Sequence, residues 1–162
     1  MAVYDEDIFE GVKEHTIDEV SEKQSPLLKE VYSSVENNKL KIAIPSLILI
    51  IEGEISDITE NGAWGYPLIN DWKKKLEKGE FKEEDELFHA KCLALTNFLA
   101  NHLFTGHSFN DDRKPFINRN WVMHGRDNSE LWTKVEVFKL INFLETLVEI
   151  KQEMDLKRRD LN

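Results

Sequence analysis

The fold is decided by residues 83–104, which read EEDELFHAKCLALTNFLANHLF. Apolar side chains recur here every three or four residues, the spacing of one face of an α-helix. One helix over this stretch would be about 33 Å long, at roughly 1.5 Å per residue. Cys92 lies on the apolar face, so we interpret it as a packing residue. The other apolar residues of that face are Leu87, Phe88, Leu95, Phe98, Leu99 and Leu103.

Further segments share this periodicity, and none alternates as a half-buried strand does. The first 24 residues are only weakly patterned and predict one short helix that frays. Pro26 and Pro45 mark helix starts, Gly125 ends a helix in the left-handed conformation, and Thr133 with Glu136 fits a capping box. The expected fold is all-α, an up-and-down bundle of four to five main helices. These helices cover residues 25–37, 45–61, 83–104, 116–124 and a stretch that opens at Thr133.

The chain has 162 residues, the size of one ordinary domain. We expect one compact unit, in which residues 1–39 form an acidic N-terminal segment and first helix beside a helical domain of residues 40–162. No apolar run approaches the roughly 20 residues of a membrane span. The N-terminus lacks the pattern of a signal peptide, and Cys92 is the only cysteine, which excludes an internal disulfide. These features predict a cytoplasmic protein that does not span a membrane.

The net charge of −10, from 21 basic and 31 acidic residues, argues against broad binding to duplex DNA. One stretch departs from this acidic average. Residues 113–126 contain four basic residues and no acid: Arg113, Lys114, Arg119 and Arg126. We predict that this island binds an anionic substrate, with Arg113, Lys114 and Arg126 as substrate-binding residues, although chance clustering explains the charges equally well.

Within the island, residues 118–126 read NRNWVMHGR. On a helix, Asn120 and His124 lie one turn apart on one face. Arg119 flanks that face about 140° from His124, and its long side chain reaches the same ligand. The carbonyl end of the helix favours a protonated imidazole. An imidazole that moves protons, a guanidinium that binds phosphoryl oxygens and an amide suit phosphodiester chemistry. The same residues also fit a second interpretation, an ordinary helix C-terminus with an arginine on the surface.

Other candidate groups are weaker. His102 and His107, with Asp111 and Asp112 nearby, are residue types that bind zinc, but their spacing crosses a helix end. We expect His15 and His89 to face solvent, without a role. The tryptophans are expected to anchor the core or an interface: Trp64, Trp72, Trp121 and Trp132.

The stretch Arg119–His124, an arginine, four intervening residues and a histidine, resembles the motif of HEPN domains and begins with the Arg-Asn pair common among them. Residues 44–53, IPSLILIIEG, resemble the early core helix of HEPN proteins from phages and bacterial defence loci. Residues 117–125, followed by the capped helix at Thr133, are similar to their C-terminal half. The likeness covers roughly residues 40–153.

This resemblance implies a homodimer in which two arginine–histidine motifs face each other across a groove. It also implies a metal-independent endoribonuclease without cofactor, in which the 2′-OH of RNA attacks the adjacent phosphate to leave a 2′,3′-cyclic phosphate. His124 would be the acid–base group, Arg119 the charge stabiliser and Asn120 the orienting residue. The roles implied are those of a toxin, an abortive-infection or phage-defence component, or an RNA-processing enzyme, with an antitoxin or a defence-system protein as partner.

Two alternatives stay open at this point. Some HEPN proteins have lost activity and only bind nucleotides or partner proteins. A metal-dependent hydrolase built on His102, His107, Asp111 and Asp112 is the second alternative. The N-terminal 40 residues lie outside the likeness and fit a partner-binding or autoinhibitory arm.

Overall fold

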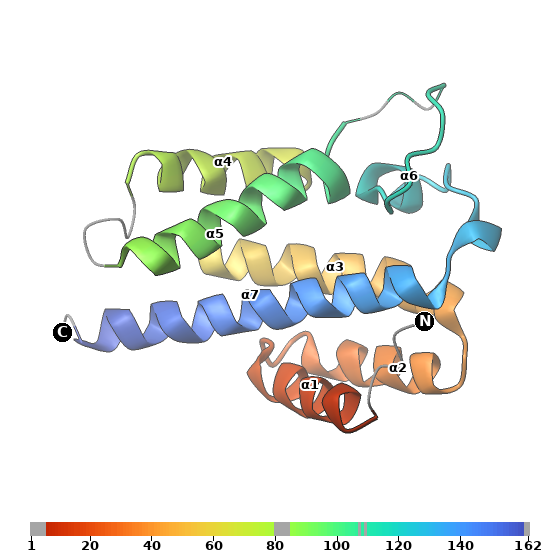
Figure 1. The fold of residues 1–162 in the computed structure, drawn as a ribbon, viewed down its shortest axis with the longest axis horizontal. Helices are drawn as coiled ribbons and strands as arrows, with labels where there is room; N and C mark the ends of the chain where they lie inside the picture. The colour runs from red at the N-terminus through yellow and green to blue at the C-terminus, as the bar shows by residue number, and fades with distance from the viewer. Residues whose placement is uncertain (1–5, 80–84, 107, 109, 161–162) are drawn as a thin grey trace. The chain divides into compact units, whose positions relative to one another are not determined.

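The computed structural model describes residues 6–79, 85–106, 108 and 110–160, and its regular secondary structure in these ranges consists of helices (Figure 1). No strand occurs among the described residues, so the predicted all-α bundle is confirmed. The α-helices are α1 (Glu6–Glu19), α2 (Ser25–Glu36), α3 (Leu40–Thr59), α4 (Tyr66–Glu77), α5 (Glu86–Phe98), α6 (Arg119–Met123) and α7 (Lys134–Asp160). Two further turns are the π-helix η1 (Leu99–Leu103) and the 3-10 helix η2 (Ser129–Leu131).

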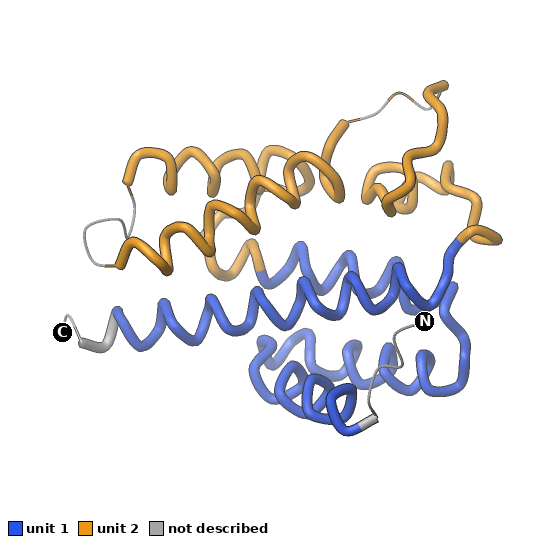
Figure 2. The backbone as a smooth tube through the Cα atoms, in the orientation of Figure 1, with its two compact units in different colours: residues 1–54, 132–162 blue, residues 55–131 orange. Residues whose placement is uncertain are grey.

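The chain divides into two compact units (Figure 2). Unit 1 comprises residues 1–54 and 132–162, and unit 2 comprises residues 55–131. Helix α3 therefore contributes its first part to unit 1 and its last turn to unit 2. The boundary expected after residue 39 falls inside unit 1 and stays a prediction.

In unit 1, α1 packs against both α2 and α7, although its sequence predicted only a short, fraying helix. Phe9 anchors α1, because its ring lies edge-on to Tyr32 of α2 at 5.8 Å and to Phe138 of α7 at 5.7 Å. Such edge-to-face pairs stabilise beyond the area that they bury. Helix α7 opens as predicted, since the Thr133 N–H and hydroxyl both donate to the carboxylate of Glu136.

Helix α3 begins five residues before the predicted start, and Pro45 lies inside it. The reason lies at the end of α2. Asn38 adopts φ 57°, and the Lys39 N–H donates to the Ser34 carbonyl at 2.7 Å, so the chain reverses within two residues and restarts at Leu40. Pro45 has no N–H to donate to the Lys41 carbonyl, so the helix contains it at the cost of one hydrogen bond in its second turn.

In unit 2, α4 packs against α5 and η1 (Figure 1). The predicted helix over residues 83–104 begins one residue after Asp85, whose carboxylate accepts the N–H groups of Leu87 and Phe88 at 3.0 Å each. Residues 83 and 84 lie outside the described ranges. From Leu99 the helix continues as the π-turn η1, which the sequence pattern did not predict. Helix α6 is shorter than the predicted span of residues 116–124.

Among the described residues, no helix combines the length and the apolar character that crossing a membrane requires.

Candidate functional site

The first element of the site is the start of α6, which is fixed by the buried side chain of Asn118. Its Oδ1 accepts the N–H of Trp121 at 3.2 Å and so caps the helix. Its Nδ2 donates to the carbonyl of Thr105 at 2.8 Å. One asparagine therefore satisfies a backbone donor of α6 and holds the helix against the segment that follows η1.

Arg119, the first residue of α6, lies against the turn that precedes α4. Its Cζ is 5.4 Å from the ring centroid of Trp64, within the range of a cation–π interaction. A Cβ on Gly65 would lie 3.9 Å from both Cζ and Nη1 of Arg119, so the guanidinium is in contact distance of that glycine. Gly65 has φ 65° and ψ −146°, a region open essentially to glycine alone.

The turn that carries Trp64 is held by Asn61. The Asn61 Oδ1 accepts the N–H of Ala63 at 2.9 Å, and its Nδ2 donates to Asp71 of α4 at 2.9 Å. The Asn61 carbonyl accepts the hydroxyl of Ser56 at 2.6 Å. The hydrogen bond from Asn61 has the largest effect and lowers the pKa of Asp71. Desolvation opposes it, and the hydrogen bond and charge of Lys75 and the charge of Lys74 lower the pKa further. The turn is thus tied to α3 and α4 on either side.

These segments of unit 2 enclose a pocket of about 410 Å³. Two residues predicted to be catalytic, Arg119 and Asn120, form part of its wall. The rest of the wall is mainly apolar and aromatic. It is formed by Ala63, Trp64, Gly65, Tyr66, Pro67, Phe104 and Gly106. An apolar hollow with a cation and an amide at its wall is typical of a small-molecule or nucleotide site.

The third predicted catalytic residue, His124, lies at the other end of α6. It is exposed, and its backbone N–H donates to the Asn120 carbonyl at 3.2 Å, which confirms the predicted one-turn spacing. Gly125 follows with φ 64°, the left-handed conformation expected of it. His124 is not among the described residues that line the pocket. The structure therefore brings Arg119 and Asn120 to one pocket and places the imidazole a turn away.

The three residues predicted to bind substrate are arranged differently from one another. Arg113 donates from Nε to Asp127 at 2.6 Å, and the Asp127 side chain is only 2% exposed. This ion pair neutralises one charge of the basic island and fastens the loop before α6 to the loop after it. Lys114 and Arg126 are exposed, and within the described part of the chain neither lines the pocket.

Of the two histidines expected to face solvent, His89 does not and His15 does so only in part. His89 is buried on α5, 8% exposed, beside the other inward residues of that helix. The ring of His15 lies 2.8 Å from Glu145 and 3.3 Å from Gln152, both on α7. Desolvation lowers the pKa of His15, but the hydrogen bond and charge of Glu145, assisted by Gln152 and Glu19, raise it above its ordinary value.

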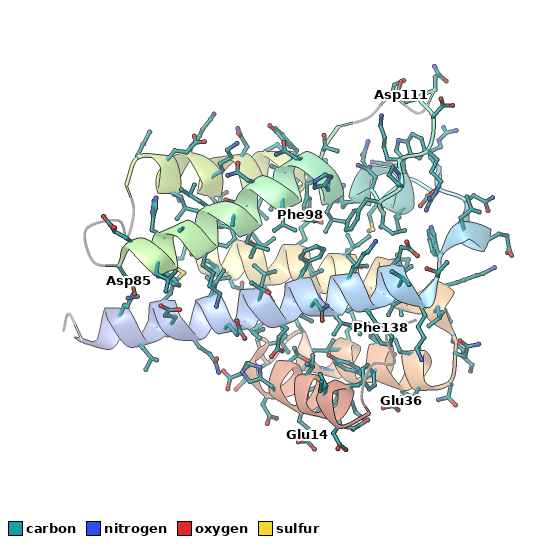
Figure 3. All side chains as sticks on the ribbon, in the orientation of Figure 1. Glu14, Glu36, Asp85, Phe98, Asp111 and Phe138 are labelled. Carbon is teal, nitrogen blue, oxygen red and sulfur yellow. The ribbon has the colours of Figure 1, made fainter. Side chains whose placement is uncertain are left out.

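The residues of the predicted metal site are only partly described. His102 is exposed, and its ring lies 4.5 Å from that of Phe98. Asp111 and Asp112 are exposed in the loop before α6 (Figure 3), and His107 lies outside the described residues. In the described ranges, no group of three or more His, Cys, Asp or Glu residues is placed to hold a metal ion. Cys92 is fully buried, as predicted.

Sequence reasoning missed three residues that form the site. No role was predicted for Asn118, although asparagine before a short helix is a common N-cap. Trp64 was expected in the core or an interface, and its exposed fraction of 67% excludes the core. No role was predicted for Gly65. The signal for both is the aromatic-glycine pair in the connection before α4, where a backbone with positive φ favours glycine.

Comparisons with protein-family models, with curated proteins and with solved structures find no match for this chain. The HEPN resemblance therefore rests on the residues of the motif and of the segments around it.

Proposed function

We propose that this chain is a metal-independent endoribonuclease of the HEPN type. The observation that carries the proposal is the pocket at the start of α6, where Arg119 and Asn120 of the motif lie beside an exposed indole. The guanidinium provides a permanent positive charge and two parallel donors for a phosphoryl group. An aromatic surface next to it suits the bases of an unpaired RNA strand.

In the proposed reaction, the 2′-oxygen of one ribose forms a bond to the adjacent phosphorus while the bond from phosphorus to the 5′-oxygen breaks. The products are a 2′,3′-cyclic phosphate and a 5′-OH. The imidazole of His124 takes the proton of the 2′-OH, and the leaving 5′-oxygen receives a proton from a protonated imidazole. Arg119 stabilises the negative charge that grows on the phosphoryl oxygens, and Asn120 orients the substrate.

A homodimer is part of this proposal because one histidine cannot act as base and acid at the same moment. His124 of one protomer and the partner subunit's His124 would then share the two proton transfers. The exposed position of His124 at the end of α6 leaves it accessible to a substrate and to a second protomer. The setting proposed is the cytoplasm, in a toxin or phage-defence system with an antitoxin or another defence protein as partner.

The test is cleavage of single-stranded RNA by the purified protein in EDTA, with detection of 2′,3′-cyclic phosphate ends. Arg119→Ala should reduce the rate by about 100-fold or more, the loss typical of removing one transition-state donor. His124→Ala should reduce it by a similar factor, because general acid–base catalysis contributes about 100-fold to 10,000-fold. Neither the substitution of half-buried Arg119 nor that of exposed His124 should change the melting temperature by more than a few degrees.

His102→Ala is the matched control, since His102 is a second exposed histidine of unit 2. It should cleave like the original chain. Full activity in purified Arg119→Ala or His124→Ala, or loss of cleavage in EDTA, would end the proposal.

A second candidate function is a HEPN module that binds nucleotides or proteins without turnover. One observation favours it: among the described lining residues of the pocket, Arg119 and Asn120 are present and His124 is not. This candidate predicts nucleotide binding that depends on Arg119, and it predicts no cyclic-phosphate product at any enzyme concentration.

A further inference from the structure

Two aromatic side chains, Trp64 in the turn before α4 and Tyr66 at the first position of α4, are unusually exposed. Trp64 is 67% exposed and Tyr66 is 47% exposed, and both belong to the wall of the same pocket. Single exposed apolar residues are ordinary, but two large rings that share one hollow with Arg119 make a specific chemical surface. The pocket volume of about 410 Å³ lies within the range of small-ligand sites.

The turn holds this surface in place before any ligand arrives. Asn61 ties the turn to α3 and α4 through the hydrogen bonds described above, and Gly65 adopts the positive φ that the turn requires beside Arg119. The guanidinium lies over one face of the indole, while the residue as a whole remains 67% exposed. A preformed surface loses little entropy on binding, which favours affinity.

We propose that this pocket is a base-binding subsite, in which one unstacked nucleobase of a single strand lies on Trp64 with its phosphate at Arg119. The inference rests on the proposed function, because it names the part of the RNA that the site holds. Every base has an aromatic face that stacks on an indole. Asn120 adds an amide whose donor and acceptor match the edge of a base.

The net charge of the chain indicates which kind of ligand the pocket binds. The chain carries a net charge of −10, so long-range attraction to a polyanion is weak and contacts must be local. A subsite that holds one base and one phosphate satisfies this condition. It also requires a single strand, because bases inside a duplex are stacked on each other and cannot offer a face. An aromatic peptide with a carboxylate is a different class of ligand, and the experiment below separates it.

The test measures the binding of a fluorescein-labelled single strand with 2′-O-methyl riboses, which cannot be cleaved, by fluorescence anisotropy. Trp64→Leu should weaken binding by about 10-fold, within the range found when an aromatic stacking platform is removed. Trp64→Phe should stay within about 3-fold of the original chain, because it keeps an aromatic face. Since the side chain is exposed, neither substitution is expected to unfold the protein.

Leu87→Ala is the control, since Leu87 is 81% exposed on α5 of the same unit and does not line the pocket. Its affinity should equal that of the original chain.

The logarithm of the binding constant should fall with the logarithm of salt concentration with a slope of only about −0.7 to −1.4, as for one or two phosphate contacts. Equal affinity of Trp64→Leu and the original chain, equal affinity for duplex and single strand, or binding of an aromatic peptide alone would overturn the inference.

The outcome for the subsite and the outcome for the ribonuclease can be told apart. If the strand binds through Trp64 but RNA gives no cyclic phosphate, the subsite stands and the ribonuclease proposal fails. If RNA is cleaved but Trp64→Leu changes neither binding nor cleavage, the ribonuclease stands and the subsite is rejected.

Discussion

Two charged side chains, Glu54 in unit 1 and Arg119 in unit 2, are set in opposite surroundings. Glu54 is fully buried and accepts three hydrogen bonds: from the Ser21 N–H at 2.9 Å, the Ser21 hydroxyl at 2.7 Å and Lys151 Nζ at 2.8 Å. Arg119 is half-buried, lies over an indole and forms part of a pocket wall.

The difference separates a structural charge from a binding one. The donors around Glu54 compensate the loss of water but leave no room for a ligand. A guanidinium held by an aromatic ring keeps its charge and remains within reach of an anion in the pocket. The comparison therefore predicts that substitutions at Glu54 affect stability, whereas substitutions around Arg119 affect binding.

The largest effect is expected for Glu54→Ala. Removing the carboxylate leaves Lys151 and the two Ser21 donors without their acceptor, and breaking a buried pair typically costs about 3–5 kcal/mol. Urea unfolding should show a fall in the free energy of unfolding of that size. Arg119→Ala should change the same quantity by less than about 1 kcal/mol, since surface charges contribute little to stability.

Glu14→Ala is the matched control for this prediction, because Glu14 is an exposed acid on α1 of the same unit (Figure 3). It should leave the free energy of unfolding within about 0.5 kcal/mol of the original chain. The contrast between Glu54 and Arg119 would be contradicted if Glu54→Ala lowered the free energy of unfolding no more than Glu14→Ala does. It would also be contradicted if Arg119→Ala lowered it as much as Glu54→Ala does.

An intermediate effect is expected for Gly65→Ala, which should affect both stability and binding. The space is sufficient, because a Cβ would have its nearest neighbours at 3.9 Å, but φ 65° with ψ −146° strains any side chain. We expect a loss of about 1–3 kcal/mol in the free energy of unfolding, or a relaxed turn that moves Trp64. Binding of the 2′-O-methyl strand should weaken in either case.

Gly62→Ala provides the control three residues earlier in the same connection. A Cβ there meets nothing within 4 Å, and Gly62 is not among the glycines with positive φ. Denaturation and anisotropy measured on both variants should separate them clearly. If Gly62→Ala and Gly65→Ala behave alike, the glycine at the pocket has no special role.

Much of the fold was predictable because helix periodicity and caps are local signals. The helix predicted over residues 25–37 is present as α2, with Leu28, Val31, Tyr32 and Val35 buried. The start of α3 was wrong because proline was interpreted as a helix start, whereas the left-handed Asn38 determines where the chain restarts. The π-turn η1 was missed because its sequence continues the apolar pattern of α5 without a break.

Less of the site was predictable, because a site depends on contacts between segments distant in sequence. The spacing in the motif correctly placed Asn120 and His124 one turn apart. It carried no information on Trp64, 55 residues before Arg119, or on the carbonyl of Thr105 that orients α6. Nor could it reveal that Asp127 pairs with Arg113, since an ion pair depends on how two loops fold.

The smallest effect on stability is expected at His15. Its ring joins α1 to α7 in unit 1 through Glu145, and it is partly exposed, whereas Glu54 is fully buried. Its pKa is raised in the folded chain, so its stabilising contribution is fully present below the ordinary value of 6.5. The contribution is lost as the pH rises through the higher folded pKa. His15→Gln should therefore destabilise the protein more at pH ~5.5 than at pH ~8, by less than about 1 kcal/mol because solvent screens the pair.

Chemical denaturation of the original chain and of His15→Gln at the two pH values measures this difference. The Glu145→Gln background supplies the control, because it removes the carboxylate whose hydrogen bond and charge raise the His15 pKa. Desolvation, the largest single influence on His15, then acts with little opposition and favours the neutral ring, so the pH dependence should shrink or change sign. An unchanged pH dependence in that background would show that another group, and not the α1–α7 contact through Glu145, sets the charge of His15.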